Sequence, residues 1–131
     1  MRYSNVRLLG RLTRAEMAWH LGCASIFVAP ACYEPFGLSI LEAAAAGCAL
    51  VLGDIPSLRE NWDGAAVFVD PEDRLALKSA VNNLIANAGQ RHRVAAAGRH
   101  RARDFTLPRM ARAYAGFYRK MTRTSAGLET A

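Results

Sequence analysis

Two glutamates eight residues apart are the first side chains in this sequence whose types and spacing suggest chemistry. Glu34 lies in the loop sequence YEPFG, and Glu42 follows it after LSIL. A helix is expected to begin at residues 38–39 and to end at Gly47, and its first backbone N–H groups have no acceptor within the helix. Together with the helix dipole, these N–H groups form an anion site that suits a phosphate.

The two carboxylates stand in different positions relative to that helix start. Glu42 is about one turn into the helix and points back toward its N-terminus, where it could accept hydrogen bonds from hydroxyls beside a bound phosphate. Glu34 could face the same ligand from the loop, and Gly37 permits close approach of the backbone. Such spacing also arises by chance, and a solvated glutamate in a first helical turn is electrostatically favourable. On the pair alone, this structural interpretation is favoured over a binding site.

The elements that would position these residues follow an alternating order. Short apolar runs are each followed by a segment of helical period, which predicts an α/β fold with a parallel sheet. Ligands bind such sheets at the carboxyl ends of the strands, so the loop that contains Glu34 is a suitable place. The pair Thr13 and Glu16 predicts a capping box for a helix that runs to Leu21. The expected strands lie near 6–9, 25–28, 49–52 and 66–69, and the C-terminal helices at 73–88, 90–104 and 108–122.

Length and composition predict one folded domain. The chain has 131 residues, of which 52% are apolar and 21% charged, so it is neither disordered nor membrane-spanning in type. The cysteines at 23, 32 and 48 match no common zinc or disulfide framework and are expected to be structural thiols. The first residues carry no apolar signal core, so a cytoplasmic location is expected.

Positive charge is concentrated in the last third of the sequence. Residues 1–90 carry 7 basic and 9 acidic side chains, whereas residues 91–131 carry 10 basic and 2 acidic ones. Such a segment attracts anionic lipid, nucleic acid or an acidic partner, although a solvated helix face is the alternative. No RNP string, zinc-finger spacing or Gly-x-x-Gly clamp accompanies the arginines, which disfavours nucleic acid. The anionic inner face of a membrane is therefore a further expected partner, which the chain would contact peripherally.

The wider string around the glutamates, VAPACYEPFGLSILEAAAAGCALV at 28–51, resembles the donor-binding segment of group 1 (GT4-like) retaining glycosyltransferases of the GT-B fold. The resemblance extends to LLGRL at 8–12, PSLRE at 56–60 and AVFVDPED at 66–73. It implies a partial Rossmann-like donor domain over 1–123, followed by a frayed tail at 124–131. The implied activity is transfer of a sugar from a nucleotide-diphosphate sugar to an acceptor that the sequence does not identify.

The resemblance also implies roles for single residues. Glu34 would be the catalytic group that contacts the donor sugar and stabilises positive charge at its anomeric carbon, and Glu42 would bind the ribose hydroxyls. No cofactor or metal is implied, and the chain contains no Asp-x-Asp sequence. The remaining site residues are Phe36, Gly37 and Leu38, whose backbone would meet sugar hydroxyls, and Ser39 and Ile40, whose N–H groups would meet the diphosphate.

Two parts of the family's fold have no counterpart in this sequence. They are the N-terminal acceptor-binding domain and the first two strands of the donor domain, which in a 3-2-1-4-5-6 sheet separate 6–9 from 26–28. We therefore expect one of two arrangements: the chain associates with another copy or an acceptor-domain partner, or the strand at 6–9 pairs directly beside that at 26–28. We also expect the chain by itself to have little catalytic activity. The alternative function is a non-catalytic interaction module whose basic C-terminal third binds an anionic partner.

Overall fold

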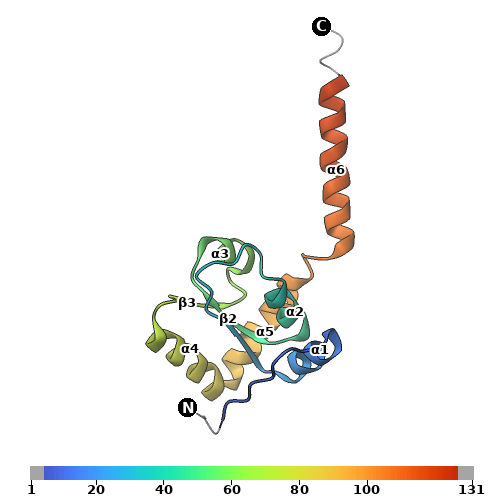
Figure 1. Ribbon diagram of the computed structural model, residues 1–131. Coiled ribbons are helices and arrows are strands. Elements are labelled where there is room, and N and C mark those ends of the chain that lie inside the picture. Colours follow the sequence, from blue (N-terminus) through green and yellow to red (C-terminus); the bar gives the residue numbers. More distant parts are fainter. Residues whose placement is uncertain (1–4, 127–131) are drawn as a thin grey trace.

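A three-stranded parallel sheet is the centre of the computed structural model, which describes residues 5–126 and the side chains of residues 5–122. The strands are β1 (Ile26–Ala29), β2 (Ala49–Gly53) and β3 (Val67–Val69), in the order β1-β2-β3. Figure 1 shows the helices before α6 gathered around the sheet, whereas α6 extends away from them. The helices are α1 (Arg14–Cys23), α2 (Leu38–Ala46), α3 (Pro56–Trp62), α4 (Arg74–Ala86), α5 (Ala88–Ala102) and α6 (Leu107–Ala126).

The middle strand, β2, is buried along its whole length. Its side chains alternate between the two faces of the sheet. Leu50 and Leu52 join an apolar cluster with residues of α2, α3 and the end of α5, whereas Ala49 and Val51 pack with Leu84 of α4. Because both faces are covered, the strand is continuously apolar, as parallel sheets require. The predicted α/β class with a partial Rossmann-like parallel sheet is confirmed.

Local capping signals fix the helix ends that the sequence predicts. Thr13 N–H donates to Glu16 Oε2 at 2.8 Å, and Glu16 N–H donates to Thr13 Oγ1 at 3.3 Å, so the predicted capping box is confirmed. Thr13 Oγ1 also donates to Glu16 Oε2 at 2.8 Å, and the two hydrogen bonds that the carboxylate accepts from Thr13 lower the pKa of Glu16. Gly47 ends α2 with a φ of +94°, in the left-handed region, and Asp73 caps α4.

The strand predicted at 6–9 is wrong. These residues form no strand, and Leu8 is 92% exposed. A strand needs a neighbour to take its backbone hydrogen bonds, and the sheet places only β2 beside β1. The expected direct pairing of 6–9 with 26–28 is therefore also wrong. In the described part of the chain, the outer edge of β1 has no strand partner.

Two further elements differ from the sequence expectation. The sequence predicts no helix between the strands near 49–52 and 66–69, but α3 begins there at Pro56, a residue whose fixed φ suits the first helical position. Helix α6 continues beyond 122 through residues 124–126, whereas the rest of the expected frayed tail, 127–131, lies outside the described residues. None of the helices described is both long and apolar enough to cross a bilayer.

Candidate functional site

The loop between β1 and α2 is held in shape by the side chain of Glu34. Its Oε1 accepts the backbone N–H of Gly37 at 2.8 Å and that of Phe36 at 3.3 Å. The glutamate is half-buried, and these bonds fold the loop back on itself. A carboxylate at this position therefore shapes the loop, a role that the sequence did not predict for it.

Gly37 is the point at which the loop becomes α2. Its φ is +81°, in the left-handed region that favours glycine, and an added Cβ would lie 2.5 Å from Ile40 Cδ1. Leu41 N–H donates to Gly37 O at 3.0 Å, which is the first hydrogen bond of the helix. The N–H groups of residues 38–40 precede it and lie at the positive end of the helix dipole. The structure thus brings the predicted loop residues and the helix start together at the carboxyl end of β1.

The predicted residues within α2 divide into buried and exposed positions. Ile40 is buried in the core, so only its backbone is offered at the helix start, whereas Leu38 and Ser39 are exposed. Glu42 follows Leu38 by four residues, is exposed, and lines a groove of about 720 Å³ between α1 and α2. No hydrogen bond joins Glu42 to Glu34, although both side chains are described. Any ligand common to both glutamates must span from the loop to the second turn of α2.

Ser57 contributes a contact to the loop that the sequence did not predict. Its Oγ, near the start of α3, donates to the backbone O of Glu34 at 2.7 Å. This bond ties the end of the loop to the segment that follows β2 and so fixes the backbone of the glutamate. Ser57 lies in the PSLRE string of the resemblance, which was the only signal that could have indicated it.

Phe105 is a second contact that the sequence did not predict. Its ring lies edge-on to Phe36 at 5.4 Å between centroids and tilted against Trp62 at 5.7 Å. The guanidinium carbon of Arg101 lies over the same ring, 4.8 Å from its centroid. Phe105 follows α5 and is far from the loop in sequence, so no local pattern indicates the contact. Through this ring the connection between α5 and α6 supports the candidate site.

A carboxylate close to the site, Asp54, is occupied by an ion pair. Arg59 donates to its two oxygens, from Nε at 2.7 Å and from Nη2 at 2.8 Å. The guanidinium lowers the pKa of Asp54, and the pKa of Arg59 is raised in return. Arg59 also bonds Asp63 and lies 4.1 Å from the centre of the Phe68 ring. Asp54 therefore remains ionised and paired, which makes it a poor proton acceptor.

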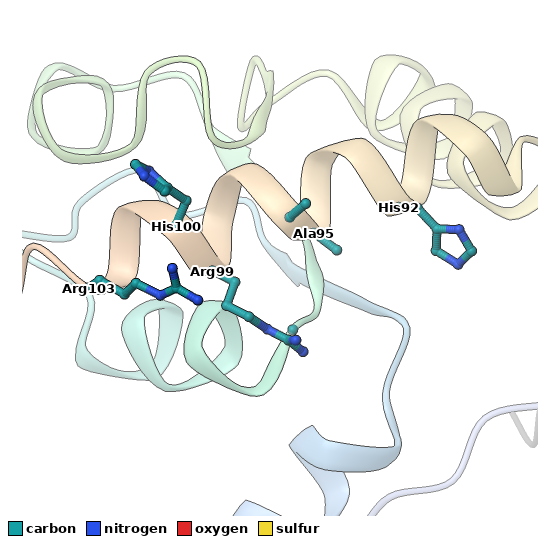
Figure 2. Close-up of a pocket in the computed structure, with 7 residues that line it drawn as sticks. His92, Ala95, Arg99, His100 and Arg103 are labelled. Carbon is teal, nitrogen blue, oxygen red and sulfur yellow. The ribbon is translucent and has the colours of Figure 1, made fainter.

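A second pocket, of about 460 Å³, lies on α5 at the opposite end of α2 from the candidate site. Figure 2 shows Arg99 and Arg103 on the side of α5 that faces α2, while His100 points to the other side of the helix. Arg99 Nη2 donates to Ala46 O at 3.3 Å, which satisfies a carbonyl at the C-terminal end of α2. The pocket is basic, but this arginine is already engaged in holding α2 and α5 together.

The cysteines and acidic groups form no metal site in the described residues, where no three potential ligands come together. Cys48 is buried, and its thiol lies 3.3 Å from Leu21 O and 3.4 Å from Ala24 O. Burial raises the pKa of this thiol, so Cys48 is the structural thiol that the sequence predicted. Cys23 and Cys32 are also free thiols, and both are exposed.

Comparison with known proteins identifies the fold family. Residues 2–87 match the family described as Glycosyl transferases group 1. The chain belongs to the group 1 glycosyltransferases. It is 33% identical to alpha-maltose-1-phosphate synthase of Mycobacterium tuberculosis over 120 residues, which are 85% of this chain and 31% of that protein. It is 37% identical to glycogen synthase of the same species over 115 residues, which are 86% of this chain and 28% of that protein.

The structure of this glycosyltransferase chain is also similar to a solved one. Sucrose-phosphate synthase from Thermosynechococcus elongatus superposes with a TM-score of 0.79 and 25% sequence identity. The similarity covers 88% of this chain and 30% of that one. The chain thus spans less than a third of the length of the relatives named here.

Proposed function

We propose that this chain is the donor-binding portion of a retaining group 1 glycosyltransferase and holds a nucleotide-diphosphate sugar at the start of α2. The observation that carries the proposal is the loop in which Glu34 binds the N–H groups of Phe36 and Gly37 just before that helix. The bonded loop and the left-handed glycine pre-organise backbone groups beside the positive end of a helix dipole. A site prepared in this way suits a diphosphate leaving group.

The transfer step assigns a part to each segment of the site. The bond between the anomeric carbon and the diphosphate oxygen breaks, and its electron pair goes to the diphosphate. The N–H groups of Ser39 and Ile40 bind the negative charge that develops there, while Glu34 balances the positive charge that develops at the anomeric carbon. An acceptor hydroxyl then forms the new bond on the same face of the sugar, which retains the configuration, and its proton passes to an oxygen of the departing diphosphate.

The other donor contacts follow from exposure and chemistry. The carboxylate of Glu42 is exposed on the same helix face as Leu38, where it can accept hydrogen bonds from the ribose hydroxyls. The backbone of Phe36, Gly37 and Leu38 would also meet the sugar hydroxyls. Because Glu34 accepts the N–H groups of Phe36 and Gly37, the groups that remain for the sugar are the carbonyl oxygens of these two residues and the N–H of Leu38. Neither a metal nor a cofactor is part of this proposal, because the helix start supplies the electrostatic stabilisation of the diphosphate.

The acceptor must be held by groups outside this site. Holding donor and acceptor together contributes up to about 7–11 kcal/mol to catalysis, and the described chain offers one wall of such a cleft. We therefore expect little turnover from the chain by itself. An acceptor-binding domain or a second copy would complete the cleft, and the open outer edge of β1 is where a further strand would extend the sheet.

Calorimetric titration of the chain with UDP- and GDP-sugars tests the proposal. We expect one of these donors to bind, and we expect Glu34→Gln and Glu42→Gln each to weaken its binding by about ten-fold or more, because a hydrogen bond to a charged group is worth roughly 1.5–3 kcal/mol. In Glu34→Gln the amide oxygen can still accept from the loop N–H groups, so the fold is preserved. Glu72→Gln is the matched control, because Glu72 is exposed and lies after β3.

Two results would overturn the proposal. One is the absence of any binding signal with nucleotide sugars. The other is binding that is equally strong in the two site variants and in Glu72→Gln. Unfolding curves of all variants establish that the comparison is made between folded proteins.

A further inference from the structure

The loop between β1 and α2, residues 30–37, is supported at two neighbouring points by residues that lie outside it. At the first point, Ser57 Oγ donates to Glu34 O at 2.7 Å. At the second, the ring of Phe36 meets that of Phe105 edge-on, with 5.4 Å between the centroids. The two loop residues are also joined to each other, because the Glu34 carboxylate accepts the N–H of Phe36 at 3.3 Å. Both supports therefore act on the same short stretch of backbone.

Both supports lead back to one side chain, that of Arg101 near the end of α5. Its Nε donates to Asn61 O at 2.7 Å, and Asn61 Nδ2 in turn donates to Ser57 O at 3.0 Å. Its guanidinium carbon lies 4.8 Å from the centre of the Phe105 ring. Arg101 thus joins the support of Glu34 and the support of Phe36 from outside the loop.

The guanidinium of Arg101 is itself held in place by a carboxylate. Its Nη1 donates to Asp104 Oδ2 at 3.0 Å, and Arg109 pairs with the other oxygen of the same carboxylate at 2.9 Å. The side chains of Arg101 and Asp104 are 37% and 34% exposed, so water screens their ion pair only in part. A guanidinium is rigid, planar and rich in N–H donors, so one side chain can bind a carbonyl, a carboxylate and an aromatic ring together.

We propose that Arg101 is a positioning residue for the donor site and sets the conformation of residues 34–37 through Asn61 and Ser57 on one side and through Phe105 on the other. This inference rests on the proposed function, which places the donor against that stretch of backbone. Binding groups must be held within about 0.5 Å of their productive positions. Residues that support them therefore contribute to affinity without touching the ligand.

NMR spectra of the chain without donor test the first half of the proposal. In Arg101→Gln the helix is kept, because glutamine has good helix propensity, but the guanidinium is lost. We expect the amide proton resonances of Phe36 and Gly37 to move upfield, because their hydrogen bonds to the Glu34 carboxylate weaken when the loop loses its supports. Ser57→Ala and Phe105→Leu interrupt the two supports one at a time. Each should move the same resonances, and these two variants decide the question if Arg101→Gln does not fold.

Titration with the nucleotide sugar that the unaltered chain binds tests the second half. Arg101→Gln should weaken donor binding by about three- to ten-fold, the range expected for the loss of one or two neutral hydrogen bonds. Combining it with Ser57→Ala should weaken binding by less than the product of the two separate effects, because both changes interrupt the same support.

Arg91→Gln is the matched control for loss of stability. Arg91 lies on the same helix, and its Nη1 donates to Leu84 O at 2.7 Å and to Ile85 O at 3.1 Å. Its replacement therefore removes comparable hydrogen bonds, but these join α5 to α4 and not to the loop. The Phe36 and Gly37 resonances and the donor affinity should be the same in this variant as in the unaltered chain.

Three results would overturn the proposal. The first is that the Phe36 and Gly37 resonances of folded Arg101→Gln match those of the unaltered chain. The second is that Arg91→Gln moves these resonances as far as Arg101→Gln does. The third is undiminished donor binding by Arg101→Gln. If the unaltered chain binds no donor, the proposed function fails, whereas the spectra without donor still decide whether Arg101 positions the loop.

Discussion

Helices α5 and α6 are both rich in arginine, but only α5 is built into the body of the protein. Gly98 and Ala102 of α5 are buried against the sheet side of the fold. Its arginines reach backbone carbonyls of other elements, from Arg91 to Leu84 O at 2.7 Å and from Arg101 to Asn61 O at 2.7 Å. In α6 the large apolar side chains are exposed instead. A basic composition can therefore bind a fold together in one helix and lie at the surface in the next.

The largest expected difference in stability is between two phenylalanine variants, one in the segment that follows α5 and one in α6. Phe105→Ala removes the ring that contacts Phe36 and Trp62, and it should lower the free energy of unfolding by roughly 2–3 kcal/mol, below the ~3–5 kcal/mol typical of fully buried rings. Phe117→Ala on the exposed side of α6 should change it by less than about 0.5 kcal/mol. Urea unfolding measures both. Equal losses would mean that α6 is packed as firmly as the segment that follows α5.

The glycines of α5 and α6 differ in the free space around their Cα atoms. A Cβ on Gly98 would lie 3.5 Å from Ala65 O and 3.7 Å from Leu50 Cδ1, whereas nothing lies within 4 Å of a Cβ on Gly116. Gly98→Leu should therefore destabilise the fold by about 1–3 kcal/mol through overpacking. Gly116→Leu should be neutral or slightly stabilising, because leucine has the better helix propensity. Thermal unfolding distinguishes the two, and a stable Gly98→Leu variant would contradict the close packing of α5.

The smallest expected difference concerns the arginines. Arg101→Gln loses the hydrogen bond to Asn61 O and the contact with the Phe105 ring, which should cost about 1–2 kcal/mol of stability. Arg112→Gln on α6 should stay within about 0.5 kcal/mol of the unaltered chain. Chemical denaturation at moderate salt is the appropriate measurement. A larger loss of stability in Arg112→Gln than in Arg101→Gln would contradict the account, because it would mean that the arginine of α6 is the one that holds the fold together.

Local signals in the sequence were sufficient for most of the secondary structure. The capping box at Thr13, the cap at Asp73 and the left-handed end at Gly47 act within a few residues, so they could be predicted without knowledge of the fold. The helix start after Glu34 was predictable for the same reason. The strand at 6–9 could not be judged in this way, because a strand depends on a neighbour that can lie far away in the chain.

The contacts that support the candidate site could not be predicted locally. Ser57 and Phe105 reach the loop from α3 and from the end of α5, and only folding brings them to Glu34 and Phe36. Helical periodicity can place the large apolar residues of α6 on one side of the helix, but the periodicity is the same for a covered and an uncovered side. The difference between α5 and α6 is a property of tertiary packing.

The central proposal, donor binding at the start of α2, is tested most directly by NMR titration of the chain with a nucleotide-diphosphate sugar. Backbone amide resonances of residues 36–42 and of Ser57 are expected to shift as donor is added, and those of residues 112–119 in α6 to remain in place. Shifts confined to the basic pocket of α5, at Arg99 and Arg103, or no shifts with excess donor, would contradict the proposal.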